Sequence, residues 1–283
     1  MTSTALRIRA LGANEVGLAL DWAAGEGWNP GLHDAACFYA ADHEGFLVGS
    51  LDDEPVATIS VVKYGATFGF LGLYIVRGEF RGQGYGMQLW TAGLARLAGR
   101  NVGLDGVVAQ QDNYRKSGFG LAYRNIRYRG TASATEAIDA RIVPLSSVPI
   151  ADVIAYDRAF FPDDRPAFLR CWIAQPESTA LGIVHGNALA GYGVVRRCRD
   201  GYKIGPLFAE DPGSAESLFS ALQAHVPRGA VLDLDVPEPN VAALALAERH
   251  RMTVVFETAR MYTDAAPQLP LRRLFGVTTF ELG

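Results

Sequence analysis

The sequence has few cysteines, no excess of positive charge and no long apolar segment. Lysine and arginine together number 26 against 30 aspartates and glutamates, a net charge of −4, and this balance disfavours a dedicated nucleic-acid binder. The three cysteines, at 37, 171 and 198, are far apart, so they predict reduced thiols rather than a disulfide framework. No apolar run approaches the roughly 18–20 residues that cross a bilayer, and the first residues lack a signal-peptide core. We therefore expect a cytoplasmic protein without membrane or nucleic-acid partners.

The composition is that of a globular protein of about two domains. The chain has 283 residues, of which 49% are hydrophobic and 20% are charged, and domains typically have roughly 100–200 residues. A stretch of small and polar residues at 130–137 is typical of a linker. We place the boundary there and predict two domains, residues 1–133 and 134–283.

Both parts show the same order of predicted elements, which is a helical region, three antiparallel strands, a helix, a strand, a further helix and a last strand. In the first part we expect a helical region at 13–40, three strands at 45–50, 56–64 and 67–76, a helix at 84–98 and a strand at 102–109. In the second part we expect a helical region at 150–175, three strands at 180–184, 189–197 and 202–208, a helix at 213–225 and a strand at 231–236. One structural unit is therefore expected twice.

The clearest chemical signal is the segment Arg81-Gly82-Gln83-Gly84-Tyr85-Gly86, which follows a predicted strand and opens a predicted helix. Its three glycines let the main chain approach a ligand without a Cβ in the way. A helix N-terminus carries about half a positive charge and binds phosphate groups, and Arg81 adds a full charge. The segment predicts a phosphate-binding turn.

Three kinds of phosphate ligand could use such a turn. A Walker A loop needs Lys followed by Ser or Thr after its last glycine, and here Met87 and Gln88 follow. A dinucleotide fingerprint needs a third glycine where Met87 stands, although Asp105 lies where a ribose-binding acid would be expected. A surface turn without a ligand is the remaining structural alternative. The spacing Arg-x-x-Gly-x-Gly between a strand and a helix fits a third kind of phosphate ligand best.

That spacing resembles the acyl-CoA pyrophosphate loop of the GNAT N-acetyltransferase superfamily. The segment 74–86 is similar to the superfamily's fourth strand and cofactor loop, and 114–119 is similar to its Tyr-x-x-x-Gly-Phe motif. The resemblance implies that strand residues pair with the pantetheine arm, loop residues hold the pyrophosphate, and Tyr114 lies near the cofactor sulfur. The implied cofactor-binding residues are Tyr74, Ile75, Val76, Arg81, Gly82, Gln83, Gly84, Tyr85, Gly86 and Asn113.

The sequence departs from the family pattern at two places. Many members carry Asn seven residues before the motif tyrosine, where this chain has Val107; we expect a short helix there and a cofactor contact from Asn113 instead. In the second part, Glu210 and Asp211 stand where phosphate would dock, and like charges repel. The chain thus resembles tandem acetyltransferases with a degenerate, YitH-type C-terminal domain, which implies one acetyl-CoA per chain.

Acyl transfer from a thioester to an amine requires that the amine loses a proton and is favoured when the leaving thiolate gains one. An alkyl ammonium, with a pKa near ~10.4, must lose a proton before it attacks. The departing thiolate is a better leaving group when it is protonated, and Tyr114, with an ordinary pKa of ~10, can supply that proton. A main-chain amide near residues 73–75 is a candidate to stabilise the oxyanion. The alternative is that Tyr114 only packs on the sheet.

The acceptor side offers several candidates. Asp233 and Asp235 alternate with apolar residues, so they share one strand face, where they could hold a cationic amine or form a solvated face. Glu26 and Asp34 lie in the first helical region, which borders the acceptor groove in GNAT folds, and Trp28 could line that groove or pack in the core. A metal site is not favoured, because no third ligand lies nearby.

Together these observations predict an α/β protein (α+β by some schemes) of two tandem GNAT-like domains, each with a mixed, mostly antiparallel sheet flanked by helices. The first binds acetyl-CoA and transfers the acetyl group to a primary amine of a small molecule by direct attack in a ternary complex, and the second closes the acceptor side. The alternative from another class is a CoA-binding sensor or scaffold without turnover. A homo-oligomer is compatible with the sequence.

Overall fold

The computed structural model describes residues 6–133, 139–186 and 188–283, and within these ranges thirteen strands form one sheet. The first half contains β1 (Arg7–Ala10), α1 (Val16–Gly25), α2 (Asp34–Ala41), β2 (Phe46–Leu51), β3 (Glu54–Tyr64), β4 (Phe68–Val76), α3 (Tyr85–Arg96), β5 (Asn101–Val107), α4 (Gln111–Lys116) and β6 (Gly120–Thr131). The second contains β7 (Ile142–Pro144), α5 (Ile150–Asp157), α6 (Pro166–Trp172), β8 (Ser178–His185), β9 (Ala188–Arg197), β10 (Tyr202–Ala209), α7 (Pro212–Gln223), β11 (Val231–Pro237), α8 (Val241–Arg249), β12 (Thr253–Tyr262) and β13 (Leu274–Gly276).

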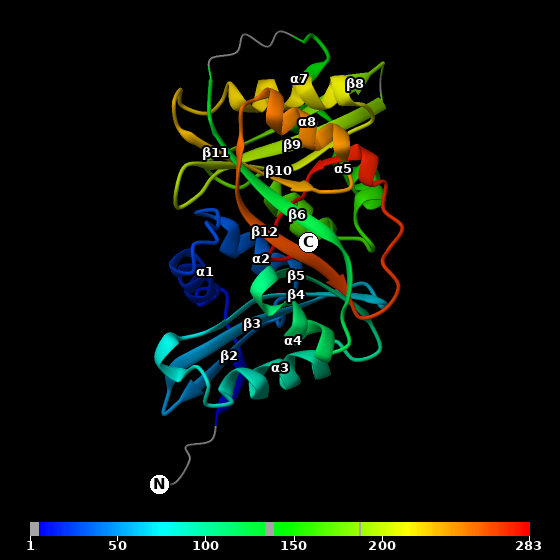
Figure 1. Cartoon of the computed structure of the whole chain (residues 1–283). Coiled ribbons are helices and arrows are strands. Elements are labelled where there is room, and N and C mark those ends of the chain that lie inside the picture. Colours follow the sequence, from blue (N-terminus) through cyan, green and yellow to red (C-terminus); the bar gives the residue numbers. More distant parts are fainter. Residues whose placement is uncertain (1–5, 134–138, 187) are drawn as a thin grey trace.

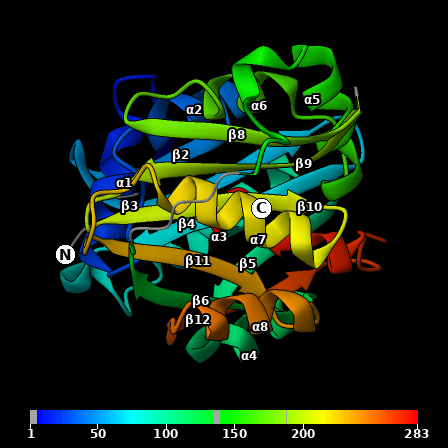
Figure 2. The same ribbon diagram turned by 90° about the horizontal axis from the view of Figure 1, so that it is seen from above.

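The predicted repeat is confirmed. In each half a pair of helices precedes three antiparallel strands, and a longer helix then leads to a parallel neighbour of the third strand: β4 pairs with β5, and β10 pairs with β11. Helix α3 covers the outer face of the first half of the sheet, and α7 with α8 covers that of the second (Figure 1). The view from above shows both halves stacked along one twisted sheet (Figure 2).

The two halves exchange their last strands. The strand order is β1-β2-β3-β4-β5-β12-β6-β11-β10-β9-β8-β7, so β12 of the second half lies between β5 and β6 of the first. Strand β6 in turn pairs with β11 along residues 125–131 and 231–237. A boundary at 133/134 therefore separates hydrogen-bonded neighbours, and the two halves are not independent units. Of the expected linker at 130–137, residues 130–131 belong instead to β6, where they pair with β11, and residues 134–137 lie outside the described residues.

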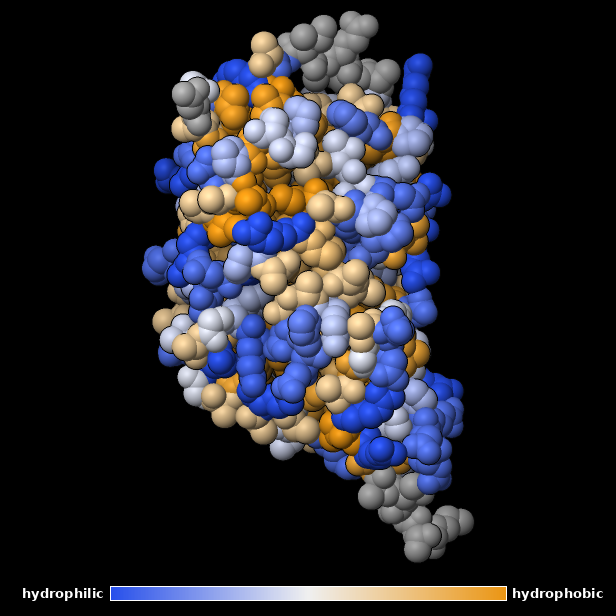
Figure 3. All heavy atoms as spheres, turned by 180° about the vertical axis from the view of Figure 1, so that it is seen from behind, coloured by the Kyte–Doolittle hydropathy of each residue, from blue (hydrophilic) through white to orange (hydrophobic). Residues whose placement is uncertain are grey.

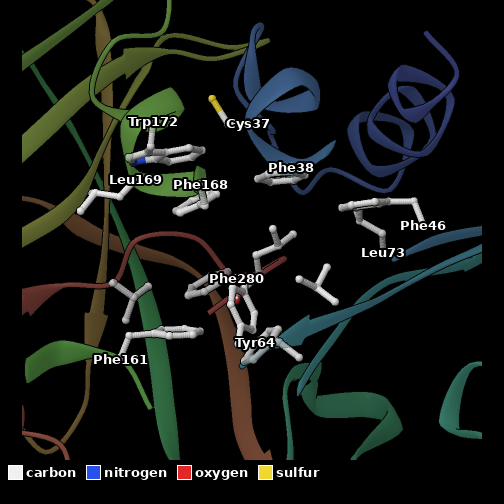
Figure 4. Packing of buried hydrophobic residues seen from close by; sticks show 14 of the residues in the cluster. Cys37, Phe38, Phe46, Tyr64, Leu73, Phe161, Phe168, Leu169, Trp172 and Phe280 are labelled. Atoms are coloured by element: carbon white, nitrogen blue, oxygen red, sulfur yellow. Dashed lines mark hydrogen bonds between the residues drawn. The ribbon is translucent and has the colours of Figure 1, made fainter. Parts of the chain in front are cut away.

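The main hydrophobic core lies between the halves and includes residues of both. Phe38 of α2 stacks on Trp172 of α6, with ring centroids 6.3 Å apart. Figure 4 shows Phe280 at the centre of the same cluster, between Phe168 on one side and Tyr64 and Phe161 on the other. Residues 277–283 thus run through the core, and a segment far along the chain reaches the middle of the molecule.

The three cysteines are free thiols, as the sequence predicts, but two of them are in contact. Cys37 and Cys171 are 134 residues apart in sequence, yet the contact between α2 and α6 brings their Sγ atoms to 2.7 Å. Both are free thiols in the structure, as is the buried Cys198. Sequence separation says nothing about such a contact, because it is made across the interface between the two halves.

The surface mixes polar and apolar residues. On the face shown in Figure 3, apolar side chains gather mainly over the upper part, which is the second half of the chain, with hydrophilic residues around them. Among the residues that the structure describes, no helix is long and apolar enough to cross a membrane.

Candidate functional site

A cavity of about 890 Å³ opens where β4 and β5 separate. The two strands pair in parallel only from Phe68–Leu71 and Asn101–Leu104. Beyond this point their main chains diverge, and the wedge between them is lined by residues 72–76 of β4 and 105–107 of β5. The loop before α3, helix α4, β12 and residues 280–281 complete the walls.

A β-bulge shapes the β4 wall. The pairing of β3 with β4 shifts between Thr58 and Ser60, so that Leu73 and Tyr74 lie opposite a single residue. Leu73 has a φ of +45°, and its carbonyl accepts a hydrogen bond from the Thr58 hydroxyl at 3.0 Å. A bulge leaves its extra residue outside the regular ladder. Main-chain groups of β4 at Leu73–Ile75 therefore border the cavity, although the Leu73 carbonyl already has the Thr58 hydroxyl as a partner.

The glycine-rich turn forms the outer end of this cavity. Gly84, with a φ of +84°, is the N-cap residue of α3, and no side chain caps the helix. The first amides of this twelve-residue helix are therefore free to bind an anion. Gly82, Gly84 and Gly86 line the cavity, but Gln83 and Tyr85 do not. The Gln83 side-chain amide donates instead to the Glu79 carbonyl at 2.8 Å.

Arg81, an expected cofactor-binding residue, lines the cavity and forms an ion pair there. Its Nε donates to the Val76 carbonyl at 2.8 Å, and its Nη2 contacts the Glu26 carboxylate at 2.5 Å. It links the end of β4, the glycine turn and the segment after α1 at the rim of the cavity. Its charge is already shared with Glu26, so it does not stand free beside the helix N-terminus.

Tyr114 lies on the wall that faces β4. It belongs to the six-residue helix α4, which is as short as the sequence suggested, and its ring stacks on Trp90 of α3 at 5.7 Å. Burial, with a smaller contribution from Tyr74, raises the pKa of Tyr114 to about 12. The phenol therefore keeps its proton at neutral pH and can donate it. Asn113 also lines the cavity, and its amide donates to Gln110 at 2.7 Å.

The corresponding opening in the second half is filled by the chain itself. Strands β10 and β11 pair only over residues 202–204 and 232–234, and β13 then pairs with β10 in the wedge beside β11. The amide of Val277 donates to the Asp235 carbonyl at 2.8 Å, which closes the gap. At the start of α7, the Asp211 carboxylate caps the amide of Ser214 at 2.9 Å, so this helix end has a partner already.

Three of the acidic candidates for the acceptor side are not at the cavity. Asp233 and Asp235 are cross-strand neighbours of Arg129 and Arg127 on β6, with Nε–Oδ1 distances of 2.8 Å and 2.7 Å. Asp34 forms a buried pair with Arg196 at 2.9 Å. The structure thus contradicts the expectation that these carboxylates hold an amine. Each is fully buried and neutralised by an arginine, and this burial requires such a partner.

The other two candidates do line the cavity. Glu26 lies at the rim in its pair with Arg81, at the end where the glycine turn is. Trp28 lies deeper, and its carbonyl accepts from Arg127 at 2.7 Å. Phe256 of β12 and Phe280 join Trp28 on this wall, so this end of the cavity is largely aromatic.

Sequence reasoning missed the contribution of residues 280–281. The Glu281 carbonyl lies so close to Gly72 of β4 that a Cβ there would be 2.2 Å from it. Glu281 is 4% exposed and lines the cavity. No local signal marks a loop residue that crosses from the second half into the first, so only the three-dimensional structure reveals it. Asp105 was considered only as a ribose ligand, but it pairs with Arg260 of β12 at the cavity floor.

Comparison with known proteins agrees with this geometry. The sequence model of the acetyltransferase (GNAT) family matches residues 15–119, and that of an acetyltransferase (GNAT) domain matches residues 153–276. The holothin acyltransferase of Pseudoalteromonas sp. (strain SANK 73390) is 32% identical over 263 residues, which are 93% of this chain and 90% of that protein.

Two solved structures share the fold. A putative acetyltransferase from Pyrococcus horikoshii superposes with a TM-score of 0.84 at 21% identity, over 100% of this chain and 98% of that one. A tandem GNAT protein from the clavulanic acid biosynthesis pathway superposes with a TM-score of 0.62 at 15% identity, over 93% and 100%. Both likenesses confirm the predicted fold class.

The repeated unit, the splayed strands and these matches define an enzyme of acyl transfer. The chain belongs to the GNAT acetyltransferase family, and it contains two such units in tandem.

Proposed function

We propose that this protein transfers an acetyl group from acetyl-CoA to a primary amine of a small molecule, with one acetyl-CoA bound per chain. The observation that carries the proposal is the single cavity that joins the uncapped start of α3 to the tyrosine of α4. The name of the holothin acyltransferase, which aligns with 93% of this chain, supports acyl transfer.

Different residues along the cavity would bind different parts of acetyl-CoA or take part in the chemical step. The amides at the start of α3 would hold the diphosphate, and the strand residues Tyr74, Ile75 and Val76 would pair with the pantetheine arm, as the family resemblance implies. A main-chain amide at the bulge would stabilise charge on the thioester oxygen. The Tyr114 hydroxyl would protonate the departing sulfur; its raised pKa keeps the phenol protonated at neutral pH, although it also makes the phenol a weaker acid. Holding amine and carbonyl in line supplies the remaining acceleration.

The test is to incubate the protein with acetyl-CoA and a panel of primary amines, polyamines and amino acids, and to follow the release of free thiol. We expect thiol release that depends on one class of amine, and acetylated product by mass spectrometry. Binding of the cofactor without turnover of any amine would favour the alternative, a CoA-binding sensor or scaffold. The intact tyrosine at the cavity wall favours the enzyme.

A further inference from the structure

Residues 277–283 are fixed in place by groups from both halves. The Arg165 guanidinium, which forms a buried pair with Asp157, donates to the Thr278 hydroxyl at 3.0 Å and to the Gly283 carbonyl at 3.2 Å. The Tyr64 hydroxyl of β3 donates to the Leu282 carbonyl at 3.2 Å. A segment held at so many points presents its side chains in one orientation, and among these is Glu281.

Glu281 is the acidic residue of the cavity that no arginine binds directly. Among the described residues that line the cavity, the other two acids are Glu26, which contacts Arg81, and Asp105, which contacts Arg260. The Glu281 carboxylate instead accepts a hydrogen bond from the Thr279 hydroxyl. Its charge has no such ion pair, so it is available to a cation that enters the cavity.

Buried charged groups of the second half and of β6 lie near Glu281. Arg127 of β6 and Arg196 of β9 interact with it electrostatically. Their paired carboxylates are Asp235 and Asp34, and the buried Lys203 adds one more positive charge near Asp235. With Asp233 and its partly exposed partner Arg129 included, four cations thus lie among four buried carboxylates, of which Glu281 is one. This balance offsets part of the cost of burying the Glu281 charge.

The position of Glu281 suits the reacting centre. Its main chain lies against Gly72, one residue before the bulge at Leu73 and Tyr74, where the thioester carbonyl is expected. The aromatic wall of Trp28, Phe256 and Phe280 lies beside it. A primary amine on an apolar body would place that body on the aromatic rings and its nitrogen at the carboxylate.

We propose, on the basis of the proposed function, that Glu281 is the catalytic base that receives the acceptor ammonium and removes its proton. The free amine then forms the N–C bond to the thioester carbonyl as the C–S bond breaks. Of the two protons that nitrogen loses, the first goes to the Glu281 carboxylate and on to solvent. The second replaces the proton that Tyr114 gives to the departing sulfur.

The test compares two primary amines on the same apolar ring. Benzylamine is an ammonium ion at pH 7 and needs a base, whereas aniline is already uncharged. We expect Glu281→Gln to lower kcat/KM for benzylamine by about 10²–10⁴-fold and for aniline by less than about tenfold, with an unchanged Kd for CoA. The matched control is Glu257→Gln on β12, because Glu257 pairs with Arg124 and does not line the cavity. We expect that variant to behave as wild type.

Thermal unfolding of each variant shows whether it is folded. Should Glu281→Gln fail to fold, Glu281→Asp carries the test, since it keeps the charge on a shorter side chain and should retain part of the benzylamine activity. Equal losses for the two amines, or wild-type rates in Glu281→Gln, would overturn the proposal for Glu281 and leave the transferase intact. A wild-type protein that acetylates neither amine nor any other would overturn both.

Discussion

The ion pair of Arg127 and Asp235 is buried, and we expect the stability of the fold to depend on the presence of both partners. The two side chains are 3% and 1% exposed and meet through two hydrogen bonds, of 2.7 Å and 2.8 Å, between β6 and β11. This contact joins a strand of the first half to one of the second. If it is structural, as we conclude, then removing one partner leaves a buried charge unpaired.

The perturbation is Arg127→Met. It leaves the Asp235 carboxylate buried and also deprives the Trp28 carbonyl of its donor. Breaking such a pair costs about 3–5 kcal/mol, out of a total unfolding free energy of about 5–15 kcal/mol. At about 2–4 °C per kcal/mol for a chain near this size, the melting temperature should fall by roughly 6–20 °C.

The control is the double variant Arg127→Met/Asp235→Leu, measured by urea unfolding and calorimetry beside both single variants. Removing both charges should recover most of the loss, apart from the roughly 1–3 kcal/mol for the unpartnered carbonyl. A single variant that loses less than about 1 kcal/mol, or a double variant as unstable as the single one, would refute the reasoning. If Asp235→Asn instead has normal stability and a raised KM for the acceptor, Asp235 binds the acceptor amine, as the sequence alone predicts.

Three further outcomes follow from the site. Tyr114→Phe should lower kcat by about 10²–10⁴-fold with an unchanged Kd for CoA; an unchanged kcat where chemistry limits the rate would remove Tyr114 from its role. Burial raises the pKa of Asp235, but the charges of Arg127, Lys203 and Arg196 outweigh it, so the pKa stays below its ordinary value. The resulting stability is present above the unfolded pKa of ~3.9 and is lost as pH falls through the folded one; urea unfolding from pH 7 to pH 2 should show this loss, and Asp235→Asn should reduce it. Calorimetry should find one CoA per chain, because β13 occupies the second opening; two equivalent sites would contradict this.

Much of the fold could be predicted because most local signals agreed with the final structure. The alternating strands, the turns between them and the glycine-rich turn before α3 all fell where the structure has them. The exchange of β6 and β12 could not be predicted, since strand pairing between distant segments leaves no trace in local periodicity. The expectation of two domains rested on the chain length, the linker composition and the repeated order of elements, and none of these reveals which strands cross over.

The cofactor end of the site was predictable and the acceptor end was not. Gly82 and Gly84 have a local meaning, because the turn before α3 gives both a positive φ, whereas Gly86 lies within α3, where a Cβ would meet Tyr74. Asp233 and Asp235 alternate as a ligand pair would, yet the same alternation serves cross-strand pairing with arginines. Glu281 carries no signal of its own, because its place depends on the long-range contacts of residues 277–283 with both halves.

A structure of the protein with CoA tests the central claim most directly. We expect the diphosphate at the amides of Gly84–Gly86, the pantetheine arm along residues 74–76, and the sulfur near the hydroxyl of Tyr114. A helix start without diphosphate, or a cofactor bound elsewhere on the molecule, would contradict the account.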